Sequence, residues 1–154
     1  AKPVKGRLVW RESGGVRILD DTYNANPVSV RAALDALREA PGGGRRWLIL
    51  GDMLELGTHT EAAHRDVGAW VAGLPVAGLA AVGPGMALAA ETARAAGCPG
   101  VATFASPEGA AAHLLPRLAR GDRVLVKGSR GMRMERAVEE LMAGLDAPGE
   151  PLPC

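Results

Sequence analysis

The sequence predicts an α/β fold of Rossmann-like type, in which a mostly parallel sheet carries helices on both faces and an N-terminal β-hairpin precedes it. Two observations favour this fold: short apolar runs recur along the chain, and helical patterns lie between them. The composition agrees, because 47% hydrophobic and 23% charged residues are typical of a globular protein. A chain of 154 residues is expected to form one domain.

The strands are predicted from the short apolar runs. Residues 7–19 are expected to form the hairpin, because two such runs flank a turn signal at Ser13-Gly14-Gly15. The parallel strands are expected at 16–19, 47–50, 79–82, 101–104 and 124–126. Their alternation with helical patterns is typical of parallel strands joined by helices.

The helices are expected to begin at capping residues. Asn26-Pro27 and Ser106-Pro107 each place a capping side chain before a proline at the first helical position. Thr58 and Glu61 have the spacing of a capping box, so a helix is expected to begin at Thr58. Apolar residues at helical spacing predict a last helix over 134–145.

The domain is expected to span residues 1–145. Residues 146–154 contain three prolines and are expected to form a flexible tail. The chain does not begin with Met, which suggests a cut upstream.

The composition argues against several classes of function. Eighteen basic against 17 acidic side chains leave a net charge of +1, too little to gather nucleic acid or an anionic membrane by charge alone. No apolar run approaches the ~20 residues of a membrane helix, and no signal peptide opens the chain. Cysteines occur only at 98 and 154, which disfavours a disulfide framework or a zinc cluster. We therefore expect a cytoplasmic protein with no nucleic-acid partner and no membrane span.

Polar side chains follow several of the predicted strands. The segments 20–27, 51–57, 83–85 and 127–131 come directly after strands, and the carboxyl ends of parallel strands meet at one edge of a sheet. Lys127 is the only lysine beyond the N-terminal segment, which favours a role in anion binding over an exposed charge. Asp52 is equally consistent with an ordinary turn, and Asn26 with a helix cap. His64 is expected to be a partly buried, hydrogen-bonded histidine rather than a metal ligand.

Nucleotide-binding fingerprints are absent from these loops. No Gly-x-Gly-x-x-Gly follows a strand, and Lys127-Gly128-Ser129 lacks the order and the upstream glycine of a P-loop. If the chain takes part in an ATP reaction, another domain must hold the phosphates.

Three motifs resemble one family. The segments DDTYNANP at 20–27, LGDMLELG at 50–57 and VKGSR at 126–130 are similar to the C-terminal domain of the Mur ligases. Within that family, the match is to the branch that adds D-alanyl-D-alanine, and the similarity runs from about residue 6 to residue 145. The Asp-Asn-Pro-Arg motif of the branch that adds a diamino acid is absent.

The resemblance implies an ATP-dependent amide-bond ligase of peptidoglycan synthesis. The implied enzyme adds D-Ala-D-Ala to UDP-N-acetylmuramoyl-tripeptide through an acyl phosphate. The partners of this chain would be the other two domains of the same enzyme. The N-terminal domain binds the UDP-sugar, and the central domain holds the ATP phosphates and Mg²⁺. The chain would close on the central domain, so it should be inactive alone and carry no catalytic residue or metal ligand of its own.

The resemblance also implies roles for individual residues. Asp21 matches the acidic residue that contacts the ATP ribose, and Tyr23, Asn24 and Asn26 lie in the loop that closes on the nucleotide. The residues that match the loops on the D-Ala-D-Ala side are Asp52, Glu55, Lys127, Ser129 and Arg130. There a cation would suit the dipeptide carboxylate, and a carboxylate would suit its ammonium group.

Two other classes of protein remain as alternatives. A phosphoacceptor receiver also has an acidic pair after an early strand and a lysine after the last one. Its acceptor Asp should end the third parallel strand, where this chain has Val82-Gly83. A non-catalytic nucleotide-binding module with the same fold is the second alternative.

Overall fold

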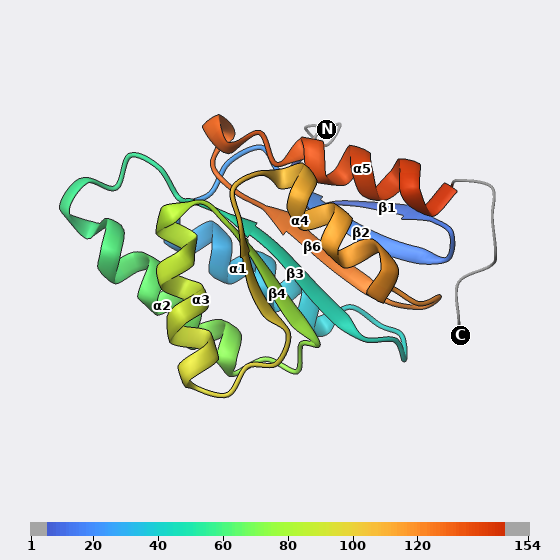
Figure 1. The fold of residues 1–154 in the computed structure, drawn as a ribbon, viewed down its shortest axis with the longest axis horizontal. Coiled ribbons are helices and arrows are strands. Elements are labelled where there is room, and N and C mark those ends of the chain that lie inside the picture. Colours follow the sequence, from blue (N-terminus) through green and yellow to red (C-terminus); the bar gives the residue numbers. More distant parts are fainter. Residues whose placement is uncertain (1–5, 147–154) are drawn as a thin grey trace.

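A single six-stranded sheet organises residues 6–146, which are the residues that the computed structural model describes (Figure 1). The strands run in the spatial order β1-β2-β6-β3-β4-β5. β1 pairs antiparallel with β2, and the other pairings are parallel. The strands are β1 (Val9–Ser13), β2 (Val16–Asp21), β3 (Arg46–Gly51), β4 (Gly78–Val82), β5 (Val101–Phe104) and β6 (Arg123–Lys127). The predicted fold class is confirmed.

Five α-helices of the described residues cover the two faces of the sheet. They are α1 (Pro27–Glu39), α2 (Thr60–Ala72), α3 (Pro84–Ala95), α4 (Pro107–Leu114) and α5 (Glu135–Asp146). α1, α2 and α3 enclose one core with the sheet, and α4 and α5 enclose the other (Figure 1). The strands alternate between these cores: in β3, Leu48 and Leu50 face the first, while Trp47 and Ile49 face the second.

The hairpin forms at the predicted turn. Ser13 pairs with Val16, and both Gly14 and Gly15 have positive φ angles, 56° and 80°. A two-residue hairpin turn of this type requires positive φ at both central positions, which glycine adopts at little cost.

Two of the three predicted helix caps are confirmed. Asn26 accepts a hydrogen bond from the backbone N–H of Ser29, and Ser106 accepts one from that of Gly109. The expected cap at Thr58 is wrong. A 3₁₀ turn, η1 (Gly57–His59), occupies that position, and α2 begins at Thr60 without a side-chain cap.

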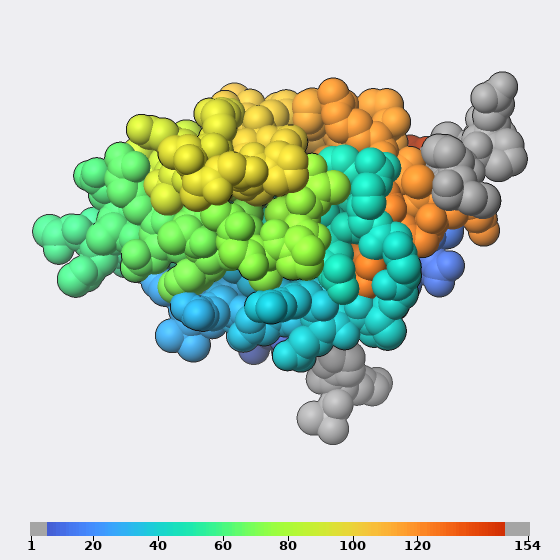
Figure 2. All heavy atoms as spheres, turned by 90° about the horizontal axis from the view of Figure 1, so that it is seen from below, coloured from blue at the N-terminus to red at the C-terminus, as the bar shows by residue number. Residues whose placement is uncertain are grey.

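α2 and α3 lie directly against each other, as the space-filling view shows (Figure 2). Gly68 permits this approach, because a Cβ at that position would collide with the carbonyl oxygen of Ala89. The last helix begins at Glu135, one residue after the buried Met134. The predicted tail lies outside the described residues except for Asp146, which belongs to α5.

Among residues 6–146, no helix is both long and apolar enough to cross a membrane.

Candidate functional site

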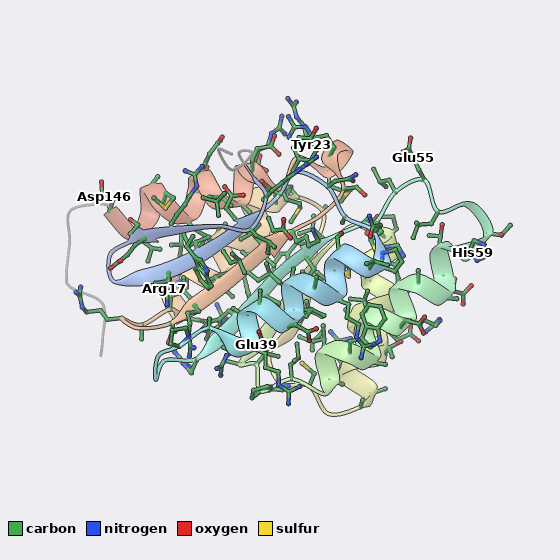
Figure 3. The ribbon with its side chains drawn as sticks, turned by 180° about the vertical axis from the view of Figure 1, so that it is seen from behind. Arg17, Tyr23, Glu39, Glu55, His59 and Asp146 are labelled. Atoms are coloured by element: carbon green, nitrogen blue, oxygen red, sulfur yellow. The ribbon has the colours of Figure 1, made fainter. Side chains whose placement is uncertain are left out.

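Three loops that carry the sequence motifs meet at the carboxyl edge of the sheet. They follow β2, β6 and β3, which are neighbours in the sheet, so the loops after them are also neighbours. Figure 3 shows Tyr23 and Glu55 near this edge, while Arg17, at the start of β2, lies at the opposite end of the sheet. The predicted convergence of these loops is confirmed.

A buried ion pair joins the first two loops. Asp21 and Lys127 are register partners at the ends of β2 and β6, and Lys127 Nζ lies 2.7 Å from Asp21 Oδ2. Lys127 Nζ also donates to the carbonyl oxygen of Asn24 at 2.9 Å. The other oxygen of Asp21 accepts a hydrogen bond from the backbone N–H of Leu8 at 3.1 Å. The structure therefore joins two residues that the resemblance assigns to different ligands, and both are buried.

Ser129 connects all three loops. Its Oγ accepts a hydrogen bond from the backbone N–H of Leu54 at 2.7 Å and donates to the carbonyl oxygen of Ala25 at 3.4 Å. Its own backbone N–H donates to the carbonyl oxygen of Asp52 at 3.0 Å. The Ser129 side chain is buried, so it positions the loops and is covered from solvent in this state.

The carboxylate of Asp52 points inward, to the start of α3. Its Oδ1 accepts a hydrogen bond of 2.6 Å from the backbone N–H of Met86. Gly83, with φ of 100°, passes so close that a Cβ there would lie 2.6 Å from Asp52 Oδ2. Asp52 thus satisfies a backbone donor in the first turn of a helix and interacts favourably with the helix dipole.

His64 lies beneath the same loop; it is hydrogen-bonded, as predicted, but fully rather than partly buried. Its Nε2 accepts a hydrogen bond from the backbone N–H of Met53 at 3.0 Å, and its Nδ1 lies 2.6 Å from the carbonyl oxygen of Thr60. Because the first nitrogen accepts and the second faces an acceptor, the arrangement requires a neutral ring with its proton on Nδ1.

Five of the predicted site residues are exposed: Tyr23, Asn24, Asn26, Glu55 and Arg130. Tyr23 is 38% exposed, and the side chain of Arg130 is 65% exposed. Glu55 is exposed and adopts a left-handed backbone conformation with φ of 61°. Asn24 Oδ1 accepts from the backbone N–H of Ala25, and Asn26 caps α1.

Sequence reasoning missed Arg7. Its guanidinium carbon lies 4.0 Å from the centre of the Tyr23 ring, with Arg130 at 5.9 Å from the same ring. The two arginines come from opposite ends of the chain, and no local pattern links either to Tyr23. The edge formed by the three loops after β2, β6 and β3 is called the rim below. The two arginines place positive charge on this rim beside the face of an aromatic ring.

Two hollows open beside these loops. A groove of about 1120 Å³ lies between the hairpin and α5, and its lining includes Tyr23, Arg130 and Glu135. A smaller hollow of about 350 Å³ is lined by the 52–57 loop, His64 and the start of α3. Glu55 lines the second hollow, whereas Tyr23 and Arg130 line the first, and the loops that carry Glu55 and Arg130 adjoin at Leu54 and Gly131.

The rim combines a buried carboxylate, that of Asp21, with the exposed ring of Tyr23. Each Asp21 oxygen has one protein partner and keeps a further lone pair, but the carboxylate itself is buried in this state. Within residues 6–146, no three His, Cys, Asp or Glu side chains gather in a way that could hold a metal ion.

Comparisons with known proteins agree on one family. Residues 6–130 match the family described as Mur ligase, glutamate ligase domain. The chain is 32% identical over 133 residues to the UDP-N-acetylmuramoyl-tripeptide–D-alanyl-D-alanine ligase of Bacillus subtilis, with 86% of the chain covered.

Solved structures extend the similarity. The chain superposes on the MurF ligase of Thermotoga maritima in complex with ADP, with a TM-score of 0.79, 30% identity and 95% of the chain covered. For MurF of Acinetobacter baumannii the values are 0.82, 33% and 92%. The chain spans only 29% of the Bacillus protein and 32% and 31% of the two crystallised chains. With the family match over most of its length, the chain belongs to the Mur ligase family, as a C-terminal domain of that family.

Proposed function

We propose that this chain is the C-terminal domain of an ATP-dependent ligase that adds D-Ala-D-Ala to UDP-N-acetylmuramoyl-tripeptide in peptidoglycan synthesis. The relatives with this name match across most of the chain, and a relative with the same fold binds ADP. The observation that carries the proposal is the rim itself: three motif loops interlocked by Lys127 and Ser129, with Tyr23, Glu55 and Arg130 facing outward.

The proposed reaction has two steps. The terminal carboxylate of the tripeptide attacks the γ-phosphorus of ATP, which gives an acyl phosphate and ADP. The amine of D-Ala-D-Ala then attacks the acyl carbon, and the tetrahedral intermediate expels phosphate as the amide forms. Water would hydrolyse the acyl phosphate, so the site must close before chemistry begins.

This chain would bind, orient and exclude water rather than transfer the phosphoryl group. Asp21, Tyr23, Asn24 and Asn26 are proposed to form the nucleotide side. Glu55 and Arg130 are exposed and carry opposite charges, which suits the ammonium and carboxylate groups of the dipeptide. Asp52 and Ser129, both buried, would contribute by holding the loop that carries Glu55.

The other domains of the enzyme complete the proposal. The N-terminal domain would hold the UDP-sugar, and the central domain would hold the ATP phosphates and Mg²⁺, which neutralises phosphate charge when bound. Because ATP and the UDP-linked substrate are cytoplasmic metabolites, we place the reaction in the cytoplasm.

A ligase assay with the full-length enzyme tests this function. With ATP, Mg²⁺, UDP-N-acetylmuramoyl-tripeptide and D-Ala-D-Ala, the enzyme should release one phosphate for each amide formed. A colorimetric assay measures the phosphate, and mass spectrometry measures the amide product. The 154-residue chain alone should give no turnover with the same substrates. Turnover by the isolated chain, or no turnover by the full-length enzyme, would contradict the proposal.

A further inference from the structure

We propose that Lys127 is a positioning residue that acts on the nucleotide through Asp21, and that it does not contact the carboxylate of the dipeptide. The inference deepens the proposed function and rests on it. It departs from the resemblance, which places Lys127 on the dipeptide side.

The burial of Lys127 is the first argument. Its side chain is only 3% exposed, and two of its three ammonium protons are directed to Asp21 Oδ2 and to the Asn24 carbonyl oxygen. A ligand carboxylate would have to displace these short contacts and reach a buried nitrogen. Arg130, in contrast, offers an exposed guanidinium at the same rim.

The second argument is the position of the two acceptors. Asp21 and Asn24 lie on either side of Tyr23, so one ammonium group fixes both ends of the short segment that presents the exposed ring. Asp21 is also held by Leu8 through its other oxygen. Lys127 therefore determines both the orientation of the Asp21 carboxylate and the path of the loop on the nucleotide side.

The third argument is electrostatic. Without Lys127, the buried Asp21 carboxylate would lose its charged partner, and a buried unpaired charge must gain water, take up a proton or move. Each outcome removes the carboxylate geometry that a ribose hydroxyl would meet. The dipeptide side is not held by this pair: Glu55 lies on the loop after β3, and Arg130, which follows Lys127 in the same loop, has an exposed side chain that pairs with Glu135 and not with Asp21.

The test uses the full-length enzyme and the variants Lys127→Met, Asp21→Asn and the double variant. Nucleotide affinity is measured by calorimetric titration with ADP in the absence of dipeptide, and the KM values for ATP and D-Ala-D-Ala are measured separately. Arg136→Ala, a change at an exposed position of α5, is the control for loss of a positive charge. Arg130→Ala reports the dipeptide side.

Lys127→Met is expected to weaken ADP binding at least about tenfold, since it removes a charged hydrogen-bond donor to Asp21. It should raise the KM for ATP by a similar factor and leave the KM for D-Ala-D-Ala within about twofold. In the Asp21→Asn background, Lys127→Met should add little to the loss of ADP affinity, because residues that act through one another are not additive. A purely structural defect would instead lower kcat through the active fraction and leave both KM values alone.

Three results would overturn the inference. Lys127→Met could raise the KM for D-Ala-D-Ala with unchanged ADP affinity, the losses of ADP affinity could be fully additive in the double variant, or Lys127→Met could change neither the ADP affinity nor the KM values. If Lys127→Met alone does not fold, the double variant, which leaves no unpaired charge at this pair, is compared with Asp21→Asn, and a further large loss of ADP affinity in the double variant overturns the inference. Calorimetric binding of ADP also separates this inference from the proposed function. An enzyme that binds ADP in the expected pattern but forms no amide would refute the function and not the positioning role.

Discussion

His64 supports the loop after β3 by accepting a 3.0 Å hydrogen bond on Nε2 from the backbone N–H of Met53. Its other ring nitrogen lies 2.6 Å from the carbonyl oxygen of Thr60, one turn earlier in α2. One side chain thus ties the loop that carries Glu55 to the helix that follows it. Because the ring and Met53 are both buried, the Met53 N–H depends on this side chain for its hydrogen bond.

Replacing His64 by Phe should therefore destabilise the chain by about 1–3 kcal/mol, since the buried N–H of Met53 loses its acceptor. Urea unfolding of the 154-residue chain, followed by circular dichroism, measures the change. His59→Gln is the control, because His59 is exposed and its replacement should stay within about 0.5 kcal/mol. Equal midpoints for His64→Phe and the wild type would show that the loop does not need this contact.

Asp52 should prove to be a structural residue of α3 as much as a residue of the rim. Asp52→Ala removes the acceptor of the Met86 N–H and is expected to cost about 1–2 kcal/mol. Asp52→Asn keeps an acceptor and should cost less. Chemical denaturation of both variants, with the exposed Asp66→Ala as control, gives the comparison. A larger loss for Asn than for Ala would contradict the capping role.

The fold could be predicted because its signals are local. Apolar periodicity defined the strands and helices, and the side chains of Asn26 and Ser106 capped helices as their sequence context indicated. The signal at Thr58 was misleading. Gly57 takes a positive φ and begins a 3₁₀ turn, and the hydroxyl of Thr60 bonds back to the carbonyl oxygen of Gly57. The capping-box spacing therefore falls within that turn.

The site could be predicted only as an edge of the sheet. Local signals placed Asp21 and Lys127 after strands, but their pairing depends on the register between β2 and β6, which are about a hundred residues apart in the chain. The inward turn of Asp52 depends on α3, 34 residues later. Arg7 precedes β1 and belongs to none of the three motif loops, yet it lies over the Tyr23 ring. The ligand roles of the site residues stay predictions until binding is measured.

Glu55 should separate stability from function. A left-handed backbone at a non-glycine residue is strained, so Glu55→Gly should keep or raise the stability of the chain, by at most about 1 kcal/mol. In the full-length enzyme, the same change removes the exposed carboxylate proposed to meet the dipeptide ammonium and should raise the KM for D-Ala-D-Ala. The KM for ATP is the internal control. An unchanged dipeptide KM would exclude Glu55 from this role.

Asp122 organises the opposite edge of the sheet and should be essential for stability. Its carboxylate accepts hydrogen bonds from the Trp47 indole and from the backbone N–H groups of Arg45 and Ala119. Asp122→Ala leaves these three donors without an acceptor and is expected to cost at least about 3 kcal/mol. For a chain of this size, that lowers Tm by about 6–12 °C, measured by differential scanning calorimetry.

The exposed Asp35→Ala is the matched control for Asp122→Ala. Because Asp122 lies at the amino ends of the parallel strands, its replacement should change stability and leave nucleotide affinity of the folded full-length enzyme unaltered. Weaker ADP binding by folded Asp122→Ala would mean that the two edges of the sheet are coupled.

His113 should make the chain less stable as the pH falls. Burial lowers the pKa of His113, with a further contribution from the nearby Arg117 cation, so the folded chain takes up this proton at lower pH than the unfolded chain does. Above the ordinary histidine pKa of about 6.5, both states are neutral and the residue contributes no pH dependence. As the pH falls below that value, the unfolded state protonates first, and stability declines until the folded-state pKa is passed. The ring also packs against Phe104, with centroids 4.9 Å apart, and this contact is made by the neutral ring in that range.

Unfolding free energies of the wild type and His113→Gln between pH 7.5 and about pH 5 measure the effect, because most carboxylates titrate below that window. The stability of the wild type should fall more steeply than that of the variant, and an NMR titration should give His113 a lower pKa than His113 has in the urea-unfolded chain. Parallel stability curves would show that His113 has the same proton affinity in both states.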